Sequence, residues 1–110
     1  MNLKTLAKIS LLLWAISFSS SANADGTWID VRSEAEYNVD SIESDVRISH
    51  ADIVKGVAEM FPDKDTEIQL YCRSGGRAGK AMSALQEAGY TNVSNAGGIN
   101  QVRKKRGVSE

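Results

Sequence analysis

The amino-acid sequence predicts an α/β fold in which a small, mainly parallel sheet is flanked by helices on both faces. Two observations predict this class. Segments rich in β-branched and aromatic residues alternate with segments whose apolar residues recur at helical spacing, and glycines gather at two places between such segments. The chain has 110 residues, of which 42% are hydrophobic and 25% are charged, and this composition suits one globular domain. A disordered, collagen-like or low-complexity chain is therefore excluded.

Local sequence patterns predict where the individual strands and helices lie. We expect strands at Thr27–Val31, Val46–Ile48, Glu67–Cys72 and Asn92–Ser94. We expect helices at 33–37, 53–61, 78–88 and 99–106. Ser33 and Glu36 have the spacing of a capping box, Pro62 ends the second helix, and Gly89 suits the C-cap of the third. Because a helix separates each strand from the next, the strands are expected to run mainly parallel.

Residues 1–24 have the three regions of a secretory signal peptide. Two lysines lie among the first eight residues, Ile9–Phe18 is almost entirely apolar, and the segment ends in the small-residue triplet Ala22-Asn23-Ala24. The apolar stretch is too short to span the roughly 30 Å hydrocarbon core of a bilayer. We therefore expect cleavage after Ala24, export to the periplasm, no membrane association of the released protein, and a single domain at 25–110.

The net charge and the small number of cysteine and histidine residues exclude several classes of function. The formal net charge of −1 gives no general attraction to nucleic acid, so no nucleic-acid partner is expected. One cysteine, Cys72, and one histidine, His50, cannot supply the four ligands of a structural zinc site, so no metal is expected. The glycine-rich segments lack the spacing of a nucleotide-binding loop, and no cofactor is expected. We also expect a monomer with small-molecule substrates.

The strongest candidate for a functional site is Cys72, which ends a predicted strand and precedes a predicted helix. Open parallel sheets bind ligands at the carboxyl ends of their strands. The following loop contains glycines, whose backbone can point several N–H groups into one concavity, and two arginines. A helix N-terminus and nearby cations favour an anion and lower the pKa of a cysteine. The candidate site consists of the nucleophile Cys72 and the substrate-binding residues Arg73, Ser74, Gly75, Gly76, Arg77 and Ala78.

The spacing between Cys72 and Arg77 distinguishes two chemistries that use such a strand, loop and helix. Cysteine phosphatases have the longer motif C-x5-R, whereas four residues stand between the two here and Ala78 occupies the phosphatase position. A shorter loop leaves less room for a tetrahedral phosphorus centre, which favours sulfur transfer. A cysteine phosphatase or arsenate reductase is the less favoured enzyme. A non-catalytic binding module or a persulfide carrier is the third alternative.

Two further groups of charged residues have structural interpretations. Asp30 and Arg32 flank Val31 on a predicted strand, so their side chains point to the same side. We expect them to form an ion pair or hydrogen bonds that support the loops, rather than to act in catalysis. The basic run Arg103–Arg106 is expected to be a solvated helix end, stabilised by the negative end of the helix dipole.

Three motifs stand in order along the predicted mature chain. They are Trp28-Ile29-Asp30-Val31-Arg32 followed by Glu36-Tyr37, the loop Tyr71-Cys72-Arg73-Ser74-Gly75-Gly76-Arg77-Ala78, and the turn Asn95-Ala96-Gly97-Gly98-Ile99. With them the chain resembles a single-domain rhodanese of the exported type. This resemblance implies the rhodanese-like fold and a thiosulfate sulfurtransferase that forms a persulfide on Cys72 and passes the sulfur to a thiophilic acceptor, either cyanide or a thiol. It also implies that the amides of Arg73 to Ala78 stabilise the persulfide.

The chain departs from the usual rhodanese pattern in two places. The segment Asp40–Ser49 keeps only the isoleucines of the sequence that usually follows the Glu-Tyr pair, and no tryptophan follows Gly97-Gly98. We expect the departure at Asp40–Ser49 to change the shape of that segment and the rim of the pocket near it, but not the nucleophile.

Overall fold

The computed structural model describes residues 26–108, and within them four strands form one parallel sheet. The strands are β1 (Thr27–Asp30), β2 (Val46–Arg47), β3 (Ile68–Cys72) and β4 (Val93–Gly98). Their order across the sheet is β2-β1-β3-β4, so β1 and β3 are the central strands. Among the described residues, no helix combines the length and the apolar character needed to cross a membrane. The predicted signal peptide lies outside the described residues.

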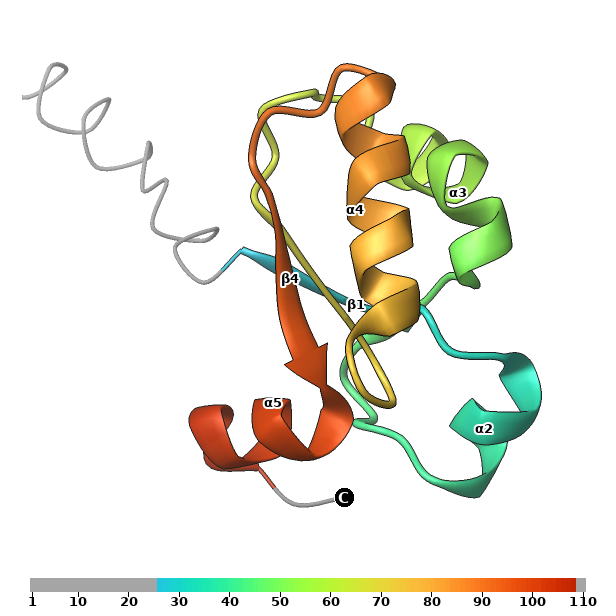
Figure 1. Cartoon of the computed structure of the whole chain (residues 1–110), viewed down its shortest axis with the longest axis vertical. Helices are drawn as coiled ribbons and strands as arrows, with labels where there is room; N and C mark the ends of the chain where they lie inside the picture. Colours follow the sequence, from blue (N-terminus) through green and yellow to red (C-terminus); the bar gives the residue numbers. More distant parts are fainter. Residues whose placement is uncertain (1–25, 109–110) are drawn as a thin grey trace, which may run out of the picture.

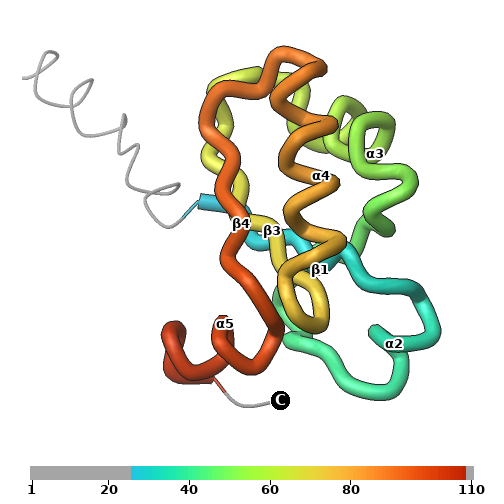
Figure 2. Tube along the Cα trace, in the orientation of Figure 1, coloured from blue at the N-terminus to red at the C-terminus, as the bar shows by residue number. Residues whose placement is uncertain are grey.

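Helices cover both faces of the sheet, which confirms the predicted fold class. α3 (Ile53–Met60) and α4 (Gly76–Glu87) pack on one face, α5 (Ile99–Arg106) packs on the other, and α2 (Glu34–Val39) follows the carboxyl end of β1 (Figure 1). Side chains along β3 alternate between two cores: Leu70 and Cys72 join the core with α3 and α4, whereas Tyr71 joins the core with α5. Figure 2 traces the chain from β3 through a tight loop into α4.

The helix boundaries follow the capping signals in the sequence. Ser33 and Glu36 form the predicted capping box: the Ser33 Oγ accepts a hydrogen bond from the Glu36 amide at 3.2 Å, and the Glu36 carboxylate accepts one from the Ser33 amide at 3.1 Å. α3 ends at Met60, shortly before Pro62, as predicted. Gly89 follows α4 with a φ of +101°, the left-handed conformation expected after a helix C-terminus.

The fourth strand is longer than the sequence predicts. The prediction ended it at Ser94 and placed Gly97-Gly98 in a loop, but β4 continues to Gly98 and pairs with Tyr71 and Cys72 of β3. Glycines have low strand propensity, which explains why the sequence pattern did not extend the strand. They suit this position because β4 passes so close to the neighbouring loop that a Cβ at Gly98 would stand 2.5 Å from the Arg73 carbonyl oxygen.

The basic end of α5 is also different from the prediction, because two of its arginines are held by acids. Arg103 pairs with Asp40 at 2.6 Å, and Arg106 pairs with Asp45 at 2.7 Å. The Arg106 guanidinium also lies 4.3 Å from the centre of the Trp28 ring. This end of the helix is therefore held against residues 40–45, and of its four basic residues only Lys104 and Lys105 are exposed.

Candidate active site

Cys72 lies at the carboxyl end of β3, and the loop that leads into α4 encloses its side chain. Only 1% of the residue is exposed. The amide of Gly75 donates a hydrogen bond to the Cys72 Sγ over 2.9 Å. The loop therefore surrounds the sulfur with peptide N–H groups that point inward. Such an arrangement stabilises negative charge on sulfur.

The pKa of the Cys72 thiol lies below its usual value although burial, the largest single influence, raises it. The backbone N–H groups of Ala78, Ser74, Gly75 and Arg77 donate toward the sulfur, and together they outweigh the effect of burial. A hydrogen bond to the charged form favours ionisation. The loop thus shifts this thiol toward the thiolate, which is the nucleophilic form of cysteine.

The turn around the sulfur depends on Gly75, the N-cap of α4. Its φ of +105° is a left-handed conformation that other residues adopt at a cost. No side chain caps α4, so the first N–H groups of the helix remain available to the sulfur and to a bound anion. Gly76 differs from Gly75, because a Cβ there would meet nothing within 4 Å. Only the first of these two glycines is therefore required by the turn.

β4 supports the loop from the side. The Asn95 side chain donates a hydrogen bond to the Gly75 carbonyl oxygen at 3.0 Å and accepts one from the Gly97 amide at 2.9 Å. Gly98 lies directly against the backbone of Arg73. The sequence presents Asn95 only as part of the third motif, and its contact with the loop was missed because it spans 20 residues.

The two arginines of the loop have different surroundings. The Arg77 guanidinium forms two hydrogen bonds with the Glu36 carboxylate, at 2.7 and 3.0 Å, whereas Arg73 is exposed. The pair with Arg77, together with the Ser33 amide, lowers the pKa of Glu36, and Glu36 raises the pKa of Arg77. Glu36 was recognised from sequence as a cap and as part of a motif, but its contact with the loop was missed. Substrate binding by Arg73 and Arg77 stays a prediction.

Known proteins share this architecture. The pattern of the Rhodanese-like domain matches residues 14–105, a range that begins within the predicted signal peptide and reaches into α5. The chain belongs to the rhodanese family. The family predicted from the three motifs is therefore confirmed.

The relatives of this rhodanese include short and long proteins. Thiosulfate sulfurtransferase PspE of Escherichia coli (strain K12) is 35% identical over 95 residues, covering 86% of this chain and 91% of that protein. The solved structure "rhodanese with anions from E. coli" is 35% identical, with a TM-score of 0.65 over 68% of this chain and 88% of that chain. A tRNA uridine(34) hydroxylase of Photorhabdus laumondii subsp. laumondii is 33% identical over 76% of this chain, but only 25% of that protein.

In this rhodanese the predicted ion pair of Asp30 and Arg32 is present and buried. The Asp30 carboxylate accepts hydrogen bonds from the Arg32 guanidinium at 2.8 and 3.0 Å and from the Arg32 amide at 3.0 Å. The same guanidinium donates to the Asp40 carbonyl oxygen at 2.6 Å, which ties the residue after α2 to β1. The pair thus holds the connection beside the site, and a supporting role in the reaction stays a prediction.

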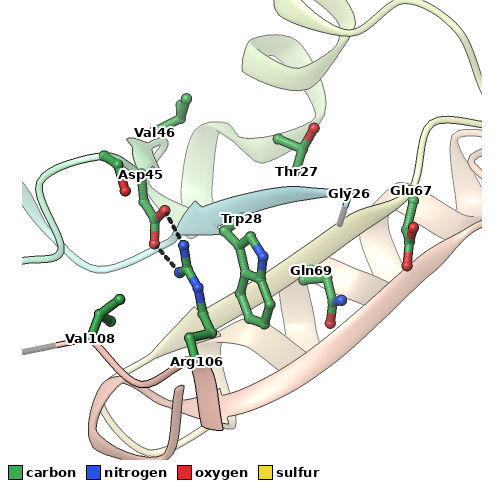
Figure 3. A pocket seen from close by; sticks show the side chains of 10 residues that line it. Gly26, Thr27, Trp28, Asp45, Val46, Glu67, Gln69, Arg106 and Val108 are labelled. Atoms are coloured by element: carbon green, nitrogen blue, oxygen red, sulfur yellow. Dashed lines mark hydrogen bonds and ion pairs between the residues drawn. The ribbon is translucent and has the colours of Figure 1, made fainter. Parts of the chain in front are cut away.

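A second buried network, around Asp45, was missed from sequence. The Asp45 carboxylate accepts a hydrogen bond from the Tyr71 hydroxyl at 2.6 Å. It also pairs with Arg106, as Figure 3 shows. It lies within the segment that departs from the usual family pattern. A pocket of about 830 Å³ opens beside Asp45, Trp28 and Arg106, and its lining includes neither Cys72 nor the loop.

Across residues 26–108, no three histidine, cysteine or acidic side chains converge where they could hold a metal ion.

Proposed function

We propose that this protein is a thiosulfate sulfurtransferase that carries sulfur as a persulfide on Cys72. The observation that carries this proposal is the Cys72 Sγ, recessed beneath inward-facing amides that lower the pKa of its thiol against the effect of burial. A thiolate held ready in this way can attack sulfur without a separate general base.

The first half-reaction is a displacement at the outer sulfur of thiosulfate. The Cys72 thiolate attacks this atom, a new S–S bond forms, and the bond between the two sulfur atoms of thiosulfate breaks. The bonding electron pair leaves with sulfite, and one negative charge stays on the terminal sulfur of the persulfide. No proton moves in this step. The amides that face the sulfur then stabilise the persulfide anion.

The second half-reaction returns the enzyme to its starting state. Cyanide, or the thiolate of a thiol acceptor, attacks the terminal sulfur of the persulfide. The S–S bond breaks and its electron pair returns to Cys72, which becomes a thiolate again. The product is thiocyanate or a persulfide of the acceptor.

Two comparisons support this proposal. The E. coli protein named as a thiosulfate sulfurtransferase shares 35% identity over most of both chains. A rhodanese from the same organism, also 35% identical, has been solved with anions, as suits a donor that is itself an anion. The substrate-binding role proposed for Arg73, Ser74, Gly75, Gly76, Arg77 and Ala78 rests on the inward-facing amides and the free N-terminus of α4.

The sequence further supports export of the protein. Under this proposal residues 1–24 are removed after Ala24, and the domain 25–110 acts as a monomer in the periplasm. An oxidising compartment exposes a lone thiol to sulfenic acid formation and to intermolecular disulfides. The 1% exposure of Cys72 limits both reactions.

Mass spectrometry of the intact protein tests the covalent step. On mixing with thiosulfate, the wild type is expected to gain about 32 Da, the mass of one sulfur atom added to the nucleophile, and to lose it again with cyanide. The matched control Cys72→Ser is expected to gain nothing. An unchanged wild-type mass, with Cys72 still open to alkylation, would overturn the proposal. Hydrolysis of an aryl phosphate without thiosulfate turnover would favour a phosphatase, and loading without discharge to cyanide would favour a carrier.

A further inference from the structure

β4 contains a β-bulge next to the Cys72 loop. The register of β4 against β3 shifts by one residue between Leu70 and Tyr71, so Ala96 is an extra residue on β4. A bulge bends its strand and changes the direction of the residues that follow it. After this bulge, Gly98 stands opposite Cys72. The bulge therefore determines how Gly98 meets the residue that carries the sulfur.

Two side-chain amides hold the glycines that follow the bulge. The Asn95 side chain accepts a hydrogen bond from the Gly97 amide at 2.9 Å. The Gln101 side chain, in the first turn of α5, accepts one from the Gly98 amide at 2.8 Å. The Gln101 Oε1 also lies so close to Gly97 that a Cβ on this glycine would overlap it. The peptide N–H groups of both glycines therefore have a side-chain partner.

The glycines held in this way pack directly against the Cys72 loop. A Cβ on Gly98 would stand 2.5 Å from the Arg73 carbonyl oxygen. A Cβ on Gly75 would stand 3.4 Å from the Gly97 Cα. These contacts join backbone to backbone, without a side chain that could absorb a shift. A movement of Gly98 is therefore transmitted to the loop.

A glutamine three residues after the N-cap of a helix ordinarily acts as a cap, which would stabilise α5 alone. A second role is favoured here, because the amide that Gln101 holds belongs to the residue opposite Cys72. We infer that Gln101 is a positioning residue for sulfur transfer, which holds Gly98 against the loop and so keeps the loop amides directed at the Cys72 Sγ. This inference rests on the proposed function. Gln101 acts through the backbone of Gly98 and of the loop.

Single-turnover kinetics test this role. Gln101→Met keeps the length of the side chain but removes the acceptor for the Gly98 amide. We expect it to lower the maximal rate of persulfide formation with thiosulfate about tenfold, because small misplacements of reacting groups are costly. Gln101→Glu keeps an acceptor oxygen and should recover most of the rate, in salt concentrated enough to screen the added charge. Gln86→Met makes the same change at an exposed glutamine near the end of α4 and should react as wild type.

The thiolate absorbance of Cys72 against pH provides a readout that needs no sulfur transfer. In Gln101→Met the loop amides are less well directed at the sulfur, so the midpoint should rise by about half a pH unit or more, since hydrogen bonds to the charged form favour it. If wild type forms no persulfide, the proposed function fails, and this comparison still decides the role of Gln101.

Two results would overturn the inference. A cap that stabilises only α5 would make Gln101→Met easier to unfold in urea while its rate and its thiolate midpoint stay as in wild type. Equally slow persulfide formation in Gln101→Met and Gln101→Glu would show that the acceptor for the Gly98 amide does not matter.

Discussion

Asn95 on β4 donates a 3.0 Å hydrogen bond to the carbonyl oxygen of Gly75, whose own amide donates to the Cys72 Sγ at 2.9 Å. The residue that turns the chain around the sulfur is therefore held from both sides. One side is the sulfur itself, and the other is the neighbouring strand. We therefore expect the position of β4 to affect the ionisation of Cys72.

Replacement of Asn95 tests this coupling. Asn95→Asp keeps an acceptor for the Gly97 amide but loses the donor to Gly75 and adds a negative charge beside the loop. We expect the pKa of Cys72 to rise, because a like charge disfavours the thiolate. The ultraviolet absorbance of the thiolate, followed against pH, measures the change. Asn92→Asp adds the same charge in the exposed turn before β4, and an equal rise in both variants would contradict a specific role of Asn95.

Two glycines near the loop offer a matched pair of substitutions. Gly98→Ala places a methyl group 2.5 Å from the Arg73 carbonyl oxygen, so the loop must shift. We expect persulfide formation to slow roughly 100-fold, since small misplacements of reacting groups are costly. Gly76→Ala meets no atom within 4 Å and should react as wild type, with equal or slightly greater stability. Rapid quenching followed by mass spectrometry measures both rates, and a normal rate in Gly98→Ala would show that the close approach is unimportant.

Neighbouring basic residues at the end of α5 are expected to differ in their effect on stability. Arg106→Ala removes two hydrogen bonds to the buried Asp45 and the contact with Trp28, so it should lower the free energy of unfolding by about 1–3 kcal/mol. Lys105→Ala changes an exposed side chain and should stay within about 0.5 kcal/mol of wild type. Urea denaturation followed by tryptophan fluorescence compares the two. Equal losses would contradict the role assigned to Arg106.

The pair of Glu36 and Arg77 predicts a pH dependence of stability with a definite sign. The bond to Arg77, and then the Ser33 amide, lower the pKa of Glu36 in the folded protein, so the pair stabilises fully above the ordinary glutamate pKa of about 4.3. This contribution is lost as the pH falls further toward the folded-state pKa. Glu36→Gln should therefore cost up to about 1 kcal/mol near neutral pH, since both side chains are partly exposed, and progressively less in acid.

Denaturation curves of wild type and Glu36→Gln across this pH range provide the measurement. Glu34→Gln is the matched control, because it removes an acid from the same first turn of α2. A difference between wild type and Glu36→Gln that stays constant from neutral to acid pH would show that the carboxylate charge does not act through the pair.

The sequence predicts those parts of the fold that depend on residues close to one another along the chain. The capping box of α2, the end of α3 before Pro62, and the succession of strand, Cys72, loop and helix all depend on residues a few positions apart. The proposed nucleophile Cys72 belongs to this group, because glycines, a strand end and a helix start are contiguous around it. Its identity as the candidate could therefore be argued before any coordinates.

The parts that the sequence could not predict are contacts between distant segments. Glu36 meets Arg77 across 41 residues and Asp45 meets Tyr71 across 26, and no local pattern indicates such pairs. The different surroundings of the two loop arginines follow from the first of these contacts. The length of β4 was missed for another reason: its glycines serve a close approach between backbones, which strand propensity does not describe.

The most direct test of the account is the pKa of the Cys72 thiol in the folded protein. Thiolate absorbance against pH, with Cys72→Ser as the blank, reports this one group. The inward-facing amides predict a midpoint clearly below about 8.5, the ordinary value for cysteine. A midpoint at or above that value would mean that burial outweighs the amides, and it would contradict the claim that the loop holds sulfur as a nucleophilic anion.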